Sequence, residues 1–204
     1  MIQSIGMELE RAISDLAEVR ERLAHVQRFE GYSAPAAAAS GIVAILAGAA
    51  QYAIAPYPHT LPEFHRYLLI WIACLAAGLV LNYGAVAIWL LRHRGFASRS
   101  RFRTAALSVA PSVVLGGALT VALADHGLYA LLPGTWFALY SIGLFASRGA
   151  IPESTLPVTC AFAVLGLAFL MTPLSAVALW WWVMPAGFGT GQLAIGYLLW
   201  KTRT

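Results

Sequence analysis

The chain has 204 residues, of which 60% are hydrophobic and only 11% are charged, and its mean hydropathy is +0.72. Soluble domains are about 45–50% apolar and about 25% charged, so this composition excludes an ordinary soluble domain and long disorder. Both cysteines lie inside apolar runs, which excludes a disulfide framework and zinc-ribbon spacing. A small polytopic membrane protein remains.

Residues 1–31 are rich in polar and charged residues and contain no continuous apolar core, so we expect no cleavable signal peptide. Apolar residues recur there on a 3.5-residue period for about four heptads. This pattern predicts a cytoplasmic amphipathic helix that associates through a coiled-coil seam, as a homodimer or with a cytoplasmic protein partner. A helix lying on the membrane, which its many acidic residues disfavour, and a helix packed under the bundle are the alternatives. The seam contains Ile5, Leu9, Leu16, Val19, Leu23 and Val26.

Six apolar runs follow, most of them near the length of about 20 residues that a helix needs to cross a bilayer. The runs are continuous and lack the alternation typical of barrel strands. Residues 32–204 are therefore predicted to form an all-α bundle of six transmembrane helices. Pro111 and Pro185 fall inside two of the runs and are expected to bend those helices. The runs are 35–55, 67–91, 104–124, 128–146, 156–171 and 175–200.

Basic residues are distributed unevenly between the two sides of such a bundle. Of the 13 Lys and Arg, Arg66 alone lies between runs one and two; the others precede run one, follow run six, or lie between runs two and three or four and five. The positive-inside rule then places both termini in the cytoplasm, and an even number of spans agrees. We expect a multi-pass cell-membrane protein, typical of a bacterial inner membrane. Its basic loops should meet lipid headgroups rather than nucleic acid.

Polar residues inside the runs offer one candidate ligand-binding site. No Asp, Glu, Lys or Arg lies clearly in the middle of a run, which disfavours an ion-coupled transporter. The milder polar residues Gln51, Asn82, Ser112 and Gln192 are candidates to line the path of a small-molecule channel or permease. Asn82 and Gln192 are expected to point into the bundle, because an unpaired amide is costly in hydrocarbon.

Histidines and acids occur together on the predicted outer side, at 59–66 and 125–126. Imidazole and carboxylate suit zinc or copper, and two histidines suit haem, so His65 and His126 are candidate metal ligands. Solvated interfacial histidines explain the same residues, and no HExxH or CxxC motif is present. A metal- or haem-binding or lipid-modifying enzyme is therefore the third hypothesis. No catalytic residue and no particular cofactor is indicated.

Glycines recur in the sixth run at 187, 189 and 191, shortly after Pro185. Small residues let helices approach closely in lipid, so ordinary packing is the main interpretation. A ligand that contacts bare backbone at this bend is the alternative.

Two segments carry a family resemblance. Residues 8–41 join a charged helix to the first run, and residues 133–147 place Trp136, Tyr140 and Gly143 in an apolar helix. Both resemble small bacterial six-span membrane proteins of uncharacterised function, often encoded beside winged-helix regulators. The resemblance covers most of the chain, implies a sensing or regulatory role and identifies no site residue. The missing intramembrane charge, the missing catalytic motifs and an N-terminal helix suited to association together predict a sensor or scaffold that passes a signal or tethers a cytoplasmic partner. A channel or permease is the alternative.

Overall fold

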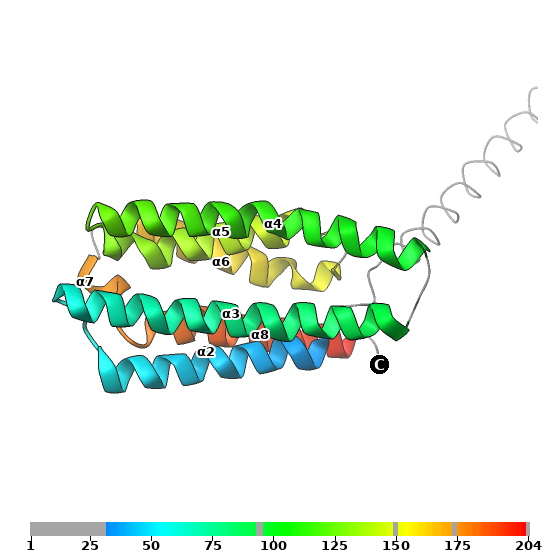
Figure 1. Cartoon of the computed structure of the whole chain (residues 1–204), viewed down its shortest axis with the longest axis horizontal. Coiled ribbons are helices and arrows are strands. Elements are labelled where there is room, and N and C mark those ends of the chain that lie inside the picture. The colour runs from blue at the N-terminus through cyan, green and yellow to red at the C-terminus, as the bar shows by residue number, and fades with distance from the viewer. Residues whose placement is uncertain (1–31, 93–95, 149–150, 173–174, 203–204) are drawn as a thin grey trace, which may run out of the picture.

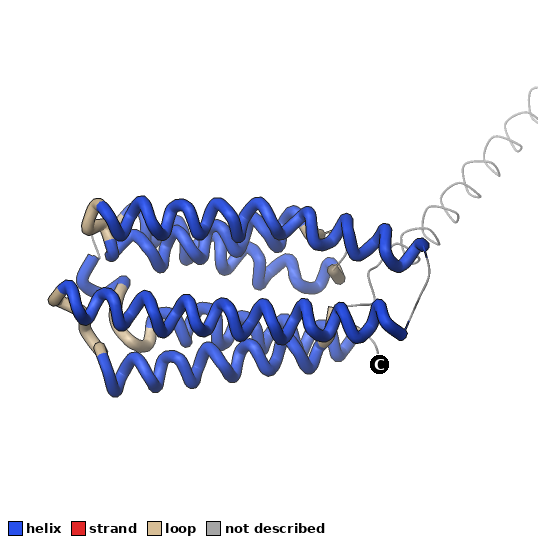
Figure 2. Tube along the Cα trace, viewed as in Figure 1, coloured by secondary structure: helices blue, strands red, loops and turns tan. Residues whose placement is uncertain are grey.

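The computed structural model describes residues 32–92, 96–148, 151–172 and 175–202, and the regular elements in these ranges are all helices (Figure 1). Figure 2 shows that the loops within the described ranges are short. The predicted N-terminal helix and its seam lie outside the described residues. Five helices are long and apolar enough to cross a membrane, which confirms an all-helical protein of multi-pass membrane type. They are α2 (Ala34–Ile54), α3 (Leu61–Arg92), α4 (Phe96–Asp125), α5 (Leu132–Ala146) with the preceding 3₁₀ turn η1 (Tyr129–Leu131), and α6 (Leu156–Met171) with η2 (Glu153–Thr155).

Local sequence explains where the first two helices begin. The Ser33 hydroxyl accepts a hydrogen bond from the Ala36 N–H at 3.3 Å, and Pro35 occupies the first turn of α2. At α3, the Glu63 carboxylate accepts from the N–H groups of His59 at 2.8 Å and Thr60 at 3.0 Å. Glu63 supplies the carboxylate half of a capping box, so α3 begins before the apolar run. Glu63, His65 and Arg66 therefore lie on the helix, and the prediction that the second helix starts only after Arg66 is wrong.

The sixth run is not the single regular helix that its length predicted. It forms the short α7 (Ser175–Ala178), leaves helical geometry, and resumes at Val183. A π-helical segment, η3 (Pro185–Gly189), then leads into α8 (Thr190–Lys201). Proline lacks the N–H that a regular helix needs, which explains why the expected bend at Pro185 takes the form of a π segment. Within the break, the Trp181 N–H donates to the Pro56 carbonyl at 3.2 Å.

The helices form two groups of three. In the first group α2 packs against α3, η3 and α8, and in the second group α5 packs against α4 and α6. Glycines bring the first group close together: a Cβ at Gly196 would lie 2.9 Å from the Ala38 nitrogen, and a Cβ at Gly41 would lie 2.9 Å from the Gly189 carbonyl oxygen. Figure 1 shows the start of α2 and the ends of α3, α5 and α8 at one end of the bundle.

Candidate functional site

The two helix groups meet around Phe188, which η3 contributes from the first group. Its ring centroid lies 4.9 Å from that of Phe137, 5.2 Å from Tyr140 and 5.3 Å from Phe162. These separations are typical of favourable aromatic pairs. Phe137 and Phe162 are buried. These four residues form what we call the aromatic joint, and they fill the space between the groups with rings.

Glycines on η3 and α8 make room for these rings. A Cβ at Gly187 would lie 2.3 Å from Phe137 Cε1, and a Cβ at Gly191 would lie 2.4 Å from Phe162 Cζ. Neither approach is possible for a residue with a side chain unless the ring moves. The packing interpretation of these glycines is therefore confirmed, because phenylalanine rings occupy the space beside their backbone.

One side-chain hydrogen bond also joins the two groups at the joint. Gln192 Nε2 of α8 donates to the Tyr140 hydroxyl of α5 at 2.6 Å. The expectation that Gln192 points into the bundle is confirmed. Away from water such a bond gains strength, while an unpaired amide would be costly, so this contact fixes how α8 faces α5.

Two more of the predicted channel residues bond at separate places between α2 and its neighbours. Gln51 is fully buried; its Nε2 donates to the Leu179 carbonyl at 2.8 Å, and its Oε1 accepts from Trp71 Nε1 at 2.8 Å. The Leu179 carbonyl is available because the sixth run leaves helical geometry there. Asn82 Nδ2 donates to Ser40 Oγ at 2.8 Å, so Asn82 also faces a neighbouring helix as expected.

Ser112, the fourth candidate, lies half-buried on α4, where its side chain comes within 3.5 Å of the position that a Cβ would take on Gly143 of α5. Among the described residues, no hydrogen bond joins any two of the four candidates. Gln51 and Asn82 instead join α2 to α3 at separate places, and Gln192 joins α8 to α5. A continuous polar path through them stays a prediction.

The histidines proposed as metal ligands are exposed at one end of the bundle. His65 lies in the second turn of α3, and His126 follows α4, where its Nδ1 lies 2.8 Å from the Ala122 carbonyl oxygen. The start of α3 and the end of α4 share one end of the bundle in Figure 1. Within the described ranges, no group of three or more His, Cys, Asp or Glu gathers. A metal site at these residues stays a prediction.

A polar cluster that was not predicted from the sequence lies at the other end of the bundle. Tyr32, directly before α2, is hydrogen-bonded to Ser147, directly after α5. Ser147 Oγ lies 3.1 Å from Ser108 Oγ of α4 and donates to the Gly143 carbonyl at 2.8 Å. Burial raises the pKa of Tyr32, so the hydroxyl stays protonated at neutral pH. We call Tyr32, Ser108 and Ser147 the tyrosine–serine cluster.

The tyrosine–serine cluster links the two groups at the point where residues 1–31 join the bundle. Tyr32 belongs to the first group by sequence, and it packs beside the buried residues Ala34, Ala37, Ile195 and Leu199. Ser147 and Ser108 belong to the second group. The signal in the sequence was a tyrosine next to a Ser-Ala-Pro helix start, but only the fold reveals its partner on α5.

Comparisons with known protein families, curated proteins and solved structures found no match for this chain.

Proposed function

We propose that this protein is a six-span membrane sensor or scaffold in which the packing of the two helix groups controls a cytoplasmic N-terminal helix. The observation that carries this proposal is the hydrogen bond between Tyr32 and Ser147. Tyr32 is the first described residue after the segment 1–31, and its partner belongs to the opposite group. A ligand or lipid change that shifts one group against the other therefore alters where the N-terminal segment leaves the bundle.

The distribution of charge supports cytoplasmic termini. Arg92 ends α3, Arg148 follows α5 and Lys201 ends α8, and these helix ends lie together in Figure 1. Arg66 lies near the start of α3, at the opposite end. The positive-inside rule assigns the basic end to the cytoplasm. The helix from Val183 to Lys201 is about 28 Å long at 1.5 Å per residue, close to the hydrocarbon thickness of about 30 Å, and serves as the sixth span.

Reporter fusions test this topology. A fusion after Pro58, which follows α2, should report the outer compartment, and a fusion after Arg148 should report the cytoplasm. If both fusions report the same compartment, the six-span topology is wrong.

The heptad pattern of residues 1–31 supports self-association of the cytoplasmic helix. In a parallel dimer Leu16 would face its own copy across the axis, whereas Glu21 would lie on the opposite side of the helix. Both substitutions, Leu16→Cys and Glu21→Cys, are placed in a chain whose native Cys74 and Cys160 are replaced by alanine. Oxidation in native membranes should cross-link the Leu16→Cys protein and not the Glu21→Cys protein. Equal yields, or a monomeric mass in detergent, would exclude the dimer and leave docking on a cytoplasmic protein.

Control of this helix by the bundle is tested through the tyrosine–serine cluster. Tyr32→Phe and Ser147→Ala each remove the bond between the groups while keeping the packing nearly unchanged. Both should change the cross-linking rate of the Leu16→Cys protein in the same direction. Tyr197→Phe is the matched control, because Tyr197 is 58% exposed on α8. Equal rates in all three variants would contradict coupling between the bundle and the N-terminal helix.

A further inference from the structure

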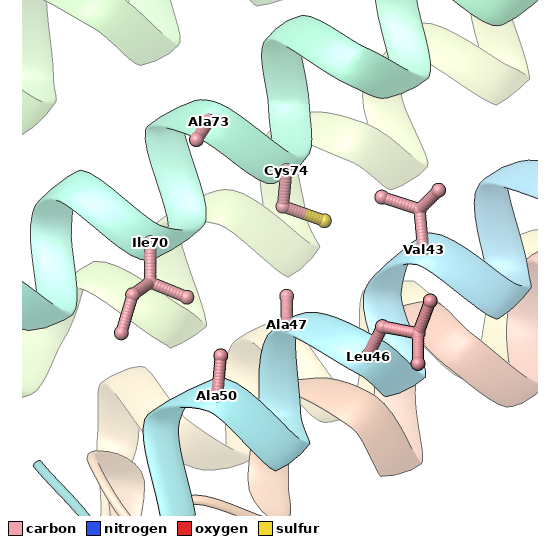
Figure 3. A pocket seen from close by; sticks show the side chains of 7 residues that line it. All are labelled: Val43, Leu46, Ala47, Ala50, Ile70, Ala73 and Cys74. Atoms are coloured by element: carbon pink, nitrogen blue, oxygen red, sulfur yellow. The ribbon is translucent and has the colours of Figure 1, made fainter. Parts of the chain in front are cut away.

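A groove with a volume of about 360 Å³ lies between α2 and α3 (Figure 3). The side chains that line it come from α2 (Val43, Leu46, Ala47 and Ala50) and from α3 (Ile70, Ala73 and Cys74). Figure 3 shows these side chains around a common space. Leu46 is 62% exposed, so the groove opens towards the surroundings of the bundle and not into its core.

Two hydrogen bonds join α2 to α3 beside this groove. Ser40 is bonded to Asn82, and Gln51 is bonded to Trp71, each at 2.8 Å. All the α2 residues that line the groove fall between Ser40 and Gln51 in the sequence. These two residues are about 16 Å apart along the helix axis, at a rise of 1.5 Å per residue. Between the two bonds the facing residues include alanines, whose side chains are too small to fill the space. The two hydrogen bonds and the small side chains between them therefore account for the groove.

The surroundings of the groove determine what fills it. Its lining residues belong to two helices that have the length and composition of membrane spans. Its walls are alkyl groups and one thiol, which give water or a polar ligand almost nothing to bond. A second helix, about 10–12 Å across with its side chains, is far larger than the groove. A flexible hydrocarbon chain fits both the volume and the chemistry.

We propose that the α2–α3 groove holds one acyl chain of a membrane phospholipid as a resident ligand. Lipid tails gain no hydrophobic energy by moving from other tails to protein, so the preference comes from close contact with a preformed wall. An empty groove would leave its walls without those contacts. The groove requires neither the N-terminal helix nor the signalling role proposed above.

A photoactivatable phospholipid tests this proposal. The full chain is reconstituted in phosphatidylcholine vesicles that contain a trace of a phospholipid with a diazirine in the middle of one acyl chain. After illumination, peptide mapping should find labels concentrated at 43–50 and 70–74. The variant Ala47→Leu/Ala73→Leu, which fills the groove, should reduce this labelling several-fold. The control variant Ala49→Leu/Ala87→Leu adds the same bulk at exposed positions outside the groove and should not reduce it.

A second measurement keeps the proposal testable if the filled variant folds poorly. Native mass spectrometry of the unmodified chain in detergent should show a stoichiometric phospholipid that Ala50→Leu alone weakens. Labelling spread evenly over the exposed helix faces, or equal labelling in the filled and control variants, would overturn the proposal. So would dimers cross-linked through Cys74 with the groove protected from the lipid probe, because a second copy would then be the occupant.

Discussion

Adding a single methyl group at Gly187, in the aromatic joint, is predicted to lower the free energy of unfolding substantially. A Cβ at Gly187 would lie 2.3 Å from Phe137 Cε1 and 2.4 Å from Cζ. The Phe137 ring is fully buried and packs against Phe162, Phe169 and Phe188, so it has no free space to enter. Overpacking of this kind costs about 1–3 kcal/mol. Gly187→Ala should therefore lower the free energy of unfolding by about that amount.

Gly84→Ala supplies the matched control. Nothing lies within 4 Å of a Cβ at Gly84, which also lies within a helix. There, alanine should be neutral or stabilising by up to about 1 kcal/mol, because it restricts the unfolded chain and favours helix. The assay is reversible unfolding of the full chain in mixed detergent micelles. The two variants therefore differ in the sign of the expected effect.

A second substitution tests whether the clash with Phe137 is what destabilises the Gly187→Ala protein. Phe137→Leu should cost less in the Gly187→Ala protein than in the unmodified protein, because the smaller side chain relieves the clash. Coupling between residues in contact is about 0.5–3 kcal/mol. The reasoning is refuted if Gly187→Ala is as stable as Gly84→Ala, or if the effects of Gly187→Ala and Phe137→Leu are simply additive.

Three further substitutions test the buried polar groups by the same unfolding assay. Among the described residues, the Tyr67 hydroxyl is buried without a hydrogen-bond partner, so Tyr67→Phe should raise the free energy of unfolding by about 1–3 kcal/mol. A loss of stability would instead reveal a bound partner. Gln51→Leu should lower it by about 1–3 kcal/mol, because it leaves the Leu179 carbonyl and the Trp71 N–H unpaired; no change would contradict the importance of these bonds. Asn82→Leu should cost less than Gln51→Leu, because Ser40 keeps its bond to the Ala36 carbonyl; an equal or larger cost would be inconsistent with this ranking.

The spans could be predicted because a helix in lipid satisfies its own backbone, so the length of an apolar run is enough to identify it. The run 156–171 coincides with α6, and the run 35–55 differs from α2 by one residue at each end. The start of α3 was predicted less well than the start of α2. It depends on the carboxylate of Glu63, which accepts from the Thr60 N–H and precedes the apolar run.

Which helices pack together could not be predicted. The membrane-spanning helices carry apolar residues on every face, so no periodicity in the sequence marks the face that is buried. The amides of Asn82 and Gln192 were expected to face the bundle, and they do, but their partners Ser40 and Tyr140 are 42 and 52 residues away in the chain. The break in the sixth run depends on a tertiary contact as well, since Gln51 bonds the carbonyl that the break exposes.

The contact between Tyr32 and Ser147 is the feature on which the proposed coupling depends most directly. Tyr32→Cys and Ser147→Cys are introduced together in a chain that lacks Cys74 and Cys160, and the protein is oxidised in native membranes. Peptide mass spectrometry should find a rapidly formed disulfide within one chain. Tyr32→Cys with Thr172→Cys, which follows α6 at the opposite end of the bundle, should form none. Equal, slow disulfide formation in both pairs would show that the start of α2 does not contact the second helix group, and would contradict the proposed coupling.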